Sequence, residues 1–221
     1  MQSAILSPRK SLNKAFLKVK PLRNDIELFK QNLIGLLDGL DETESEEHNK
    51  NDLVAFLKST FYQKFYVNTK GRNDLVIHNG PDARSFAGVL IEAKKPSNKS
   101  EMIRPDNLNV KAFHELILYY LRERITNHNL EIRHLVATNI FEWYIFDAGL
   151  FEKLLAQDKT LVKQFTDFEE GRLSGNTTDF FYRQIAEPFL SGISAELSFT
   201  MFDFREYDEP LRNMIKKTIQ N

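Results

Sequence analysis

Two stretches of sequence, Arg72-Asn73-Asp74-Leu75-Val76-Ile77 and Val89-Leu90-Ile91-Glu92-Ala93-Lys94-Lys95, decide the fold. Each is an apolar run of strand length interrupted by an acidic residue, and the turn-forming stretch Asn79-Gly80-Pro81-Asp82 lies between them. A third β-rich run, residues 64–68, precedes them across the turn at Lys70-Gly71. The three runs predict an antiparallel meander.

The charged residues of these strands predict a site. Side chains alternate between the two faces of a strand, so Glu92 and Lys94 project from one face and Ala93 from the other. The segment between Asp74 and Glu92 is long enough for two paired strands and a loop, which brings both carboxylates within reach of one cation. Carboxylate oxygens suit Mg²⁺, and a bound cation can generate hydroxide and stabilise charge on a phosphate. We therefore expect a hard-metal site at which Lys94 orients or deprotonates water, or neutralises developing charge.

The surrounding sequence predicts the fold class. Helical spacing of apolar residues predicts three helices, over residues 24–40, 46–61 and 108–125. Further β runs cover residues 132–138, 141–146 and 197–204, and residues 151–192 are mixed and mostly helical. This order predicts an α/β fold with a mixed central β-sheet flanked by helices. We expect a helical lead-in over residues 1–45, the core over 46–150, and a helical and strand extension of the same domain over 151–221.

Composition narrows the class of protein. The chain has 221 residues, of which 42% are hydrophobic and 28% charged, which is ordinary for a globular domain. There is no cysteine, which excludes disulfides, thiolate zinc sites and cysteine nucleophiles. No apolar run reaches the roughly 18 residues of a membrane span, and the start lacks signal-peptide character, so we expect a soluble cytoplasmic protein. The net charge of −1 argues neither for nor against nucleic acid.

The pattern of Asp74 followed by Glu92-Ala93-Lys94 resembles the PD-(D/E)xK nuclease motif, with Asn73 where the motif has a loosely kept proline. The flanking stretches 71–77, 91–96, 114–122 and 137–143 together are similar to the N-terminal nuclease region of type IIG restriction-modification enzymes. The resemblance spans about residues 8–207.

This resemblance implies a restriction-endonuclease-like fold and Mg²⁺-dependent hydrolysis of DNA that leaves a 5′-phosphate, with Mn²⁺ able to substitute. The implied catalytic residues are Asp74, Glu92 and Lys94, and the implied metal ligands are Asp74, Glu92 and the carbonyl of Ala93. Family members often add an acidic residue from the helix before the Asp strand. Glu47 is the choice here and Glu46 is its rival.

The helix after the Lys strand carries a further element in the family, Gln-x-x-x-Tyr, and Glu115 to Tyr119 has this spacing with Glu in place of Gln. These two residues either support the site or form a buried hydrogen bond that braces the helix. The substitution of Gln by Glu leaves both alternatives open.

The type IIG family also implies a context. Its members continue from the nuclease into a helical connector, an S-adenosylmethionine-dependent adenine methyltransferase and a target-recognition domain. The present sequence has no Asn-Pro-Pro-Tyr tetrad and no Gly-rich cofactor loop, so S-adenosylmethionine would bind only outside these residues. We expect an excised fragment or a stand-alone subunit from a prokaryote. Its expected partners are double-stranded DNA and the other domains of the same polypeptide.

Other interpretations remain open at this point. Asp74, Glu92 and Lys94 can form an ordinary surface ion pair on an edge strand, or the domain can be a catalytically silent DNA-binding or interaction module. A nuclease of another context, such as a type I-like subunit or a repair enzyme, fits the same pattern. Neither His78 nor His114 has a second histidine at ligand spacing, which argues against zinc.

Overall fold

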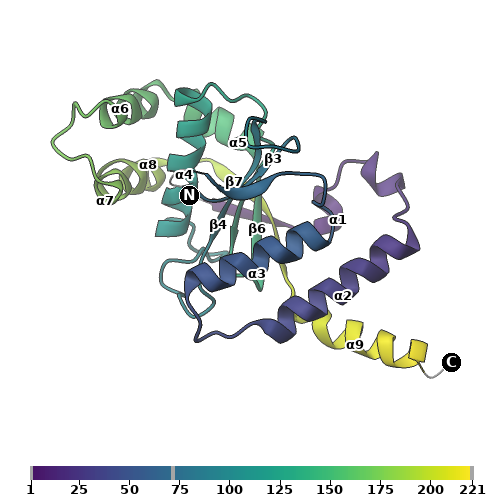
Figure 1. Ribbon diagram of the computed structural model, residues 1–221. Coiled ribbons are helices and arrows are strands. Elements are labelled where there is room, and N and C mark those ends of the chain that lie inside the picture. The colour runs from purple at the N-terminus through teal and green to yellow at the C-terminus, as the bar shows by residue number, and fades with distance from the viewer. Residues whose placement is uncertain (1, 71–72, 220–221) are drawn as a thin grey trace.

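One mixed sheet organises the molecule (Figure 1). The computed structural model describes the backbone of residues 2–70 and 73–219 and the side chains of residues 3–68 and 75–213. Within this part of the chain, seven strands lie in the order β1-β7-β6-β5-β4-β3-β2. Their bounds are β1 (Gln2–Leu6), β2 (Val67–Lys70), β3 (Asn73–His78), β4 (Ala87–Ala93), β5 (His134–Thr138), β6 (Glu142–Asp147) and β7 (Glu196–Asp203).

The helices follow the order expected from the apolar spacing. The α-helices are α1 (Pro8–Ser11), α2 (Arg23–Gly39), α3 (Glu46–Ser59), α4 (Lys111–Leu121), α5 (Ala148–Phe151), α6 (Lys159–Glu169), α7 (Thr178–Phe181), α8 (Glu187–Gly192) and α9 (Arg205–Ile219). A 3₁₀ turn, η1 (Phe16–Lys18), follows α1, and the π-helical turns η2 (Arg122–Thr126), η3 (Glu152–Ala156) and η4 (Tyr182–Ala186) extend α4, α5 and α7.

The predicted meander forms one side of the sheet, with β2 as the edge strand. Strands β2, β3 and β4 pair antiparallel in sequence order, which confirms the prediction from the turn residues. Strand β5 then lies parallel to β4, which requires a crossover, and α4 provides it. Strands β5, β6 and β7 pair antiparallel. The expected mixed α/β fold, with a central sheet flanked by helices, is confirmed.

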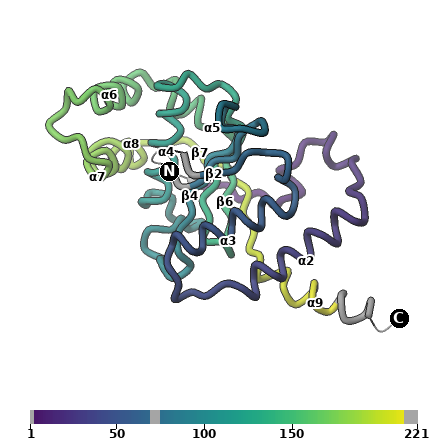
Figure 2. Tube along the Cα trace, viewed as in Figure 1, coloured from purple at the N-terminus to yellow at the C-terminus, as the bar shows by residue number. Residues whose placement is uncertain are grey.

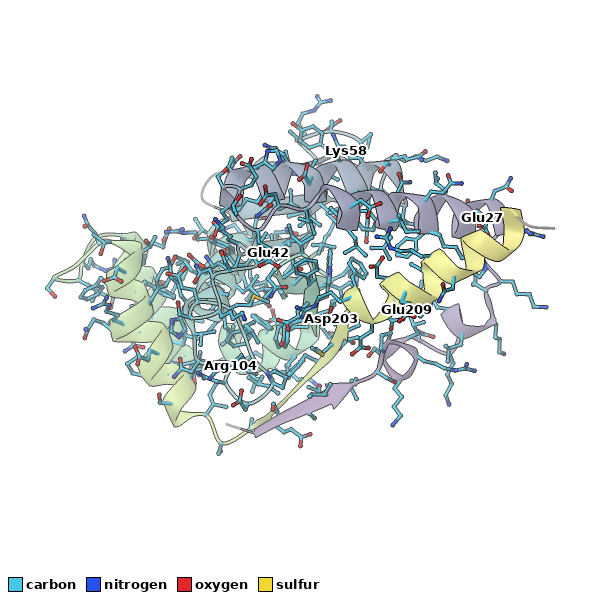
Figure 3. The ribbon with its side chains drawn as sticks, turned by 90° about the horizontal axis from the view of Figure 1, so that it is seen from below. Glu27, Glu42, Lys58, Arg104, Asp203 and Glu209 are labelled. Carbon is cyan, nitrogen blue, oxygen red and sulfur yellow. The ribbon has the colours of Figure 1, made fainter. Side chains whose placement is uncertain are left out.

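Two apolar layers cover the two faces of the sheet. On one face α4 and the helices from α5 to α8 pack on side chains such as Leu90 and Phe146. On the other face α2, α3 and the start of α9 pack on side chains such as Ile91 and Trp143. Figure 2 shows α2, α3 and α9 gathered on one side of the strands, and Figure 3 shows the same helices from below. The consecutive residues Leu90 and Ile91 therefore face different helical layers.

Local sequence explains where α3 begins. The hydroxyl of Ser45 accepts a hydrogen bond from the backbone N–H of His48 at 3.1 Å, which satisfies one of the free donors at the helix start. Glu46 and Glu47 lie in the first turn, where the helix dipole favours negative charge. Both glutamates thus have a structural reason to be where they are.

The N-terminal segment differs from its prediction. Residues 1–45 were expected to be a helical lead-in, but Gln2–Leu6 forms β1, which pairs in parallel with β7 at the edge of the sheet. Ala4 lies opposite Ser198, and the hydroxyls of Ser11 and Thr200 are hydrogen-bonded to each other. A five-residue strand whose partner lies almost a chain length away leaves little local periodicity to recognise.

Candidate functional site

The register of β3 against β4 brings together the two strands that carry the candidate residues. Leu75 lies opposite Ile91 and Val76 opposite Leu90 in an antiparallel ladder. Continuing this register by one residue places the backbone of Asp74 opposite Glu92. The predicted neighbourhood of the two strands is therefore confirmed. The side chain of Asp74 lies outside the described part of the chain.

Glu92 and Lys94 form a buried ion pair at the end of β4. Their side chains lie on the face of the sheet that α4 covers, because Leu90 packs in that layer while Ile91 and Ala93 pack against α2 and α3. Nζ of Lys94 lies 2.6 Å from Oε1 of Glu92, and the two residues are 4% and 0% exposed. Such burial excludes the interpretation as a surface ion pair. Burying two charges is costly unless each has a partner, so removal of either residue would leave an uncompensated charge in the interior.

A second carboxylate contacts the same ammonium. Oε2 of Glu115, from the middle of α4, lies 2.6 Å from Nζ of Lys94, and Glu115 is itself buried. Glu101 is more distant at 3.8 Å, and its other oxygen pairs with Lys111 at 2.9 Å. Burial alone would lower the pKa of Lys94, but Glu92 and Glu115 outweigh it and raise that pKa above its ordinary value. The site is a cation held between carboxylates from a strand and a helix.

Two buried tyrosines lie near this cluster: Tyr182, for which the sequence offered no signal, and Tyr119, which the Glu115–Tyr119 spacing had singled out. Tyr182, in η4, is buried, and its pKa is raised by burial and then by the charge of Glu115. Its ring lies 6.2 Å from the ring of His114. Tyr119, one turn along α4 from Glu115, is also buried. A motif search cannot find Tyr182, because nothing in the local sequence shows that η4 packs against α4.

His114 has a structural role. Its Nε2 lies 2.6 Å from Oδ1 of Asn109, while the amide nitrogen of Asn109 donates to Oγ of Ser191 and to the carbonyl of Glu187. With its nitrogen donating elsewhere, Asn109 uses its oxygen as the acceptor, so Nε2 of His114 carries the proton. Burial lowers the pKa of His114 to about 4, which keeps the ring neutral. The network ties the start of α4 to α8.

The other residues singled out from the sequence lie apart from this cluster. Glu47 is exposed in the first turn of α3, a helix that packs on the opposite face of the sheet from α4. Glu46 pairs with Lys50 at 3.1 Å. Lys95 faces away from Lys94, as expected, and donates to the carbonyl of Thr43 at 3.1 Å. His78 is buried, and its two ring nitrogens are hydrogen-bonded to the carbonyl oxygen of Ser85 and to Oδ1 of Asn68.

Among residues whose side chains are described, no group of three or more His, Cys, Asp or Glu residues is arranged to hold a metal ion. The side chain of Asp74, the implied second carboxylate, is not among the described side chains. The backbone N–H of Lys94 donates to the carbonyl of Thr138 at 2.8 Å, which anchors the end of β4 to β5. The metal ligands implied by the family resemblance therefore remain a proposal.

A polar cavity lies at the same end of the sheet. It has a volume of about 620 Å³ and lies between the loop after Lys94 and the turn between β5 and β6, with Pro96, Lys99 and Asn139 among its lining residues. Glu42 and Arg104, which are labelled in Figure 3, also line it. The cavity provides space and polar groups at the end of the sheet where β4 ends, although Glu92, Lys94 and Glu115 are not among its lining residues.

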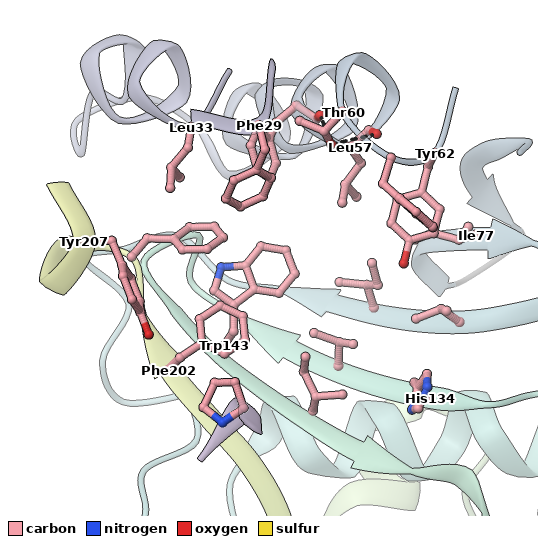
Figure 4. A pocket seen from close by; sticks show the side chains of 18 of the residues that line it. Phe29, Leu33, Leu57, Thr60, Tyr62, Ile77, His134, Trp143, Phe202 and Tyr207 are labelled. Carbon is pink, nitrogen blue, oxygen red and sulfur yellow. Dashed lines mark hydrogen bonds between the residues drawn. The ribbon is translucent and has the colours of Figure 1, made fainter. Parts of the chain in front are cut away.

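A second cavity, of about 440 Å³, is almost wholly apolar and lies on the other face of the sheet (Figure 4). Phe29 and Leu33 lie on its helical side, and Trp143, Phe202 and Tyr207 on the side of the sheet and α9. It carries no cluster of charged groups, so it offers nothing for hydrolytic chemistry.

Among the helices that the structure describes, none is long and apolar enough to cross a membrane. No curated protein and no solved structure gives a significant match to this chain. A family model described as a domain of unknown function, DUF7149, matches residues 6–221, so the chain belongs to that family.

Proposed function

We propose that this chain is the Mg²⁺-dependent nuclease domain of a restriction-modification enzyme and hydrolyses phosphodiester bonds of double-stranded DNA. The observation that carries the proposal is the buried pair of Glu92 and Lys94 at the end of β4, with the backbone of Asp74 opposite Glu92 on β3. The order α3-β2-β3-β4-α4-β5 adds support, because a helix, a meander and a crossover helix surround the motif as the resemblance implies.

The residues present fit a hard cation. Glu92 presents a carboxylate at the sheet end, and the register makes the backbone of Asp74 its neighbour on β3. Two carboxylates and the carbonyl of Ala93 are oxygen donors of the kind that Mg²⁺ and Mn²⁺ accept. A bound cation would supply a polarised water and neutralise charge on the scissile phosphate.

The chain's own residues account for the rest of the chemistry. The ammonium of Lys94, fixed beside Glu92, can donate a hydrogen bond to a water or a phosphate oxygen that enters the site. Glu92 holds Lys94 at the sheet end, and in this proposal a DNA strand passes the same end of the sheet, where the cavity lined by Pro96 lies. Recognition of a base sequence would fall to other domains of the same polypeptide, along with any S-adenosylmethionine-dependent methylation.

The test uses the natural polypeptide that contains this chain, with plasmid DNA and Mg²⁺ or Mn²⁺. Asp74→Asn, Glu92→Gln and Lys94→Ala are each expected to reduce cleavage by about 10³-fold or more, while Lys58→Ala, at an exposed position in the last turn of α3, should stay within about twofold. Cleavage at the wild-type rate by either Asp74→Asn or Lys94→Ala would overturn the proposal.

A catalytically silent DNA-binding or interaction module is the second candidate. The observation that favours it is the closed network of Lys94 with Glu92 and Glu115, which can serve stability alone. Calorimetry with Mn²⁺ separates the two candidates. Binding that disappears in Glu92→Ala supports the nuclease, and the same weak heat in both proteins supports the silent module.

A further inference from the structure

We infer that Glu115 is a positioning residue that holds the ammonium of Lys94 beside Glu92 for cleavage. The inference rests on the proposed nuclease function and assigns to α4 a defined part in it. The contact that carries it is the 2.6 Å distance between Oε2 of Glu115 and Nζ of Lys94, equal to the distance from Lys94 to Glu92.

A lysine side chain needs such a restraint. It has four rotatable bonds, and confining it to one position costs conformational entropy. Glu92 lies two residues away on the same strand, so this contact alone leaves the ammonium free to swing about the strand axis. Glu115 reaches it from a different element and thereby fixes a second direction.

The choice of Glu115 over Glu101 follows from distance, exposure and competition. The Glu101 side chain is 33% exposed, lies 3.8 Å from Lys94, and already binds Lys111 and Asn98. The Glu115 side chain is 10% exposed and makes the shorter contact. Attraction is stronger at the shorter distance and is less screened in the buried position.

Glu115 is in turn held by a rigid support. Ten of the eleven residues of α4 are buried. His114, the residue before Glu115, is hydrogen-bonded to Asn109, and Asn109 donates to Ser191. These two hydrogen bonds anchor the first half of α4. A carboxylate on such a helix can define the position of a flexible ammonium, whereas one on a loop could not.

The test compares Glu115→Gln with Glu115→Leu in the natural polypeptide, under steady-state conditions with Mg²⁺. Glutamine keeps an oxygen that can accept from Lys94 and should retain cleavage within about fivefold. Leucine has similar size and no acceptor, and should lower kcat by about 100-fold with KM for DNA within about twofold, as displacement of a catalytic group by about 1 Å does. Equal kcat for the wild type and the Leu variant, or equal losses in both variants, overturns the inference.

A matched control and a second variant complete the design. Glu152 binds the hydroxyl of Tyr120 at the far end of α4, so Glu152→Gln removes a helix-bound carboxylate away from the site and should stay within about twofold. Glu115→Asp keeps the charge but shortens the side chain, which covers the case that the Leu variant does not fold. It should lower kcat about tenfold at constant KM, and wild-type kcat in Glu115→Asp overturns the inference.

The outcome for Lys94 separates the two levels of the argument. If Lys94→Ala abolishes cleavage and Glu115→Leu retains it, the nuclease function stands and the positioning role fails. If Lys94→Ala itself cuts at the wild-type rate, the proposed function fails and the inference fails with it.

Discussion

Nζ of Lys94 lies 2.6 Å from Oε1 of Glu92, which is two residues earlier in the chain, and both side chains are buried. Alternation along the strand explains why they share a face, and α4 explains why water is excluded. Lys94 thereby compensates the charge of two buried carboxylates, Glu92 and Glu115. We therefore expect Lys94 to contribute to the stability of the fold as well as to the proposed reaction.

The first prediction concerns Lys94→Met. It leaves Glu92 and Glu115 buried without their shared cation, so we expect the free energy of unfolding to fall by about 3–5 kcal/mol. Urea titration monitored by circular dichroism measures it. The exposed Lys99→Met should change stability by less than about 0.5 kcal/mol. Equal midpoints for wild type and Lys94→Met would show that the carboxylates do not depend on Lys94.

The second prediction concerns pH and His114. Burial lowers the pKa of His114 from 6.5 to about 4. Between these two pH values the histidine is protonated in the unfolded chain and neutral in the folded protein. Stability from this group is therefore complete above pH 6.5 and is lost as pH falls toward 4, by up to about 3 kcal/mol.

Urea midpoints between pH 7 and 4.5 test this pH dependence. His114→Gln should flatten the profile over that range. A His114→Gln profile as steep as that of the wild type would contradict the assignment.

The third prediction uses the chain's single tryptophan, Trp143. Its ring stacks on Phe202 with centroids 6.0 Å apart, and its Nε1 donates to the carbonyl of Ile140 at 2.8 Å. Trp143→Ala should cost about 3–5 kcal/mol of stability. Trp143→Phe keeps most of the ring area but loses the hydrogen bond, and should cost less, about 1–2 kcal/mol. Thermal unfolding followed by circular dichroism checks the order, and equal costs would contradict it.

The fourth prediction concerns Asn129, which is fully buried between β4 and the end of α4. Its amide donates to the carbonyl of Ala87 at 2.9 Å and to Oε2 of Glu123 at 3.1 Å. Asn129→Ala removes the donor of both hydrogen bonds and leaves the two buried acceptors without it. We expect the free energy of unfolding to fall by about 2–4 kcal/mol. Asn127 also donates to Glu123 but is exposed, so Asn127→Ala is the matched control, expected to cost under about 1 kcal/mol. Similar losses from both changes would show that burial does not decide the cost.

Local patterns predicted the central elements because those elements are specified locally. Turn residues around Gly80 and apolar runs on either side sufficed for the β3–β4 hairpin, and the apolar spacing around Leu116 sufficed for α4. Strand β1 escaped prediction because its pairing with β7 depends on residues almost two hundred positions away. Tyr182 escaped for the same kind of reason, since its place beside His114 depends on how η4 packs against α4.

By itself, the sequence determined that Glu92 and Lys94 share one face of a strand, since alternation is a property of each strand alone. It also determined that the strand of Asp74 precedes that strand across a tight connection. Only the tertiary structure decided that Glu115 meets Lys94, and that Glu47 lies exposed in the opposite layer. Helix-to-sheet contacts depend on the packing of side chains far apart in the chain, which no local spacing encodes.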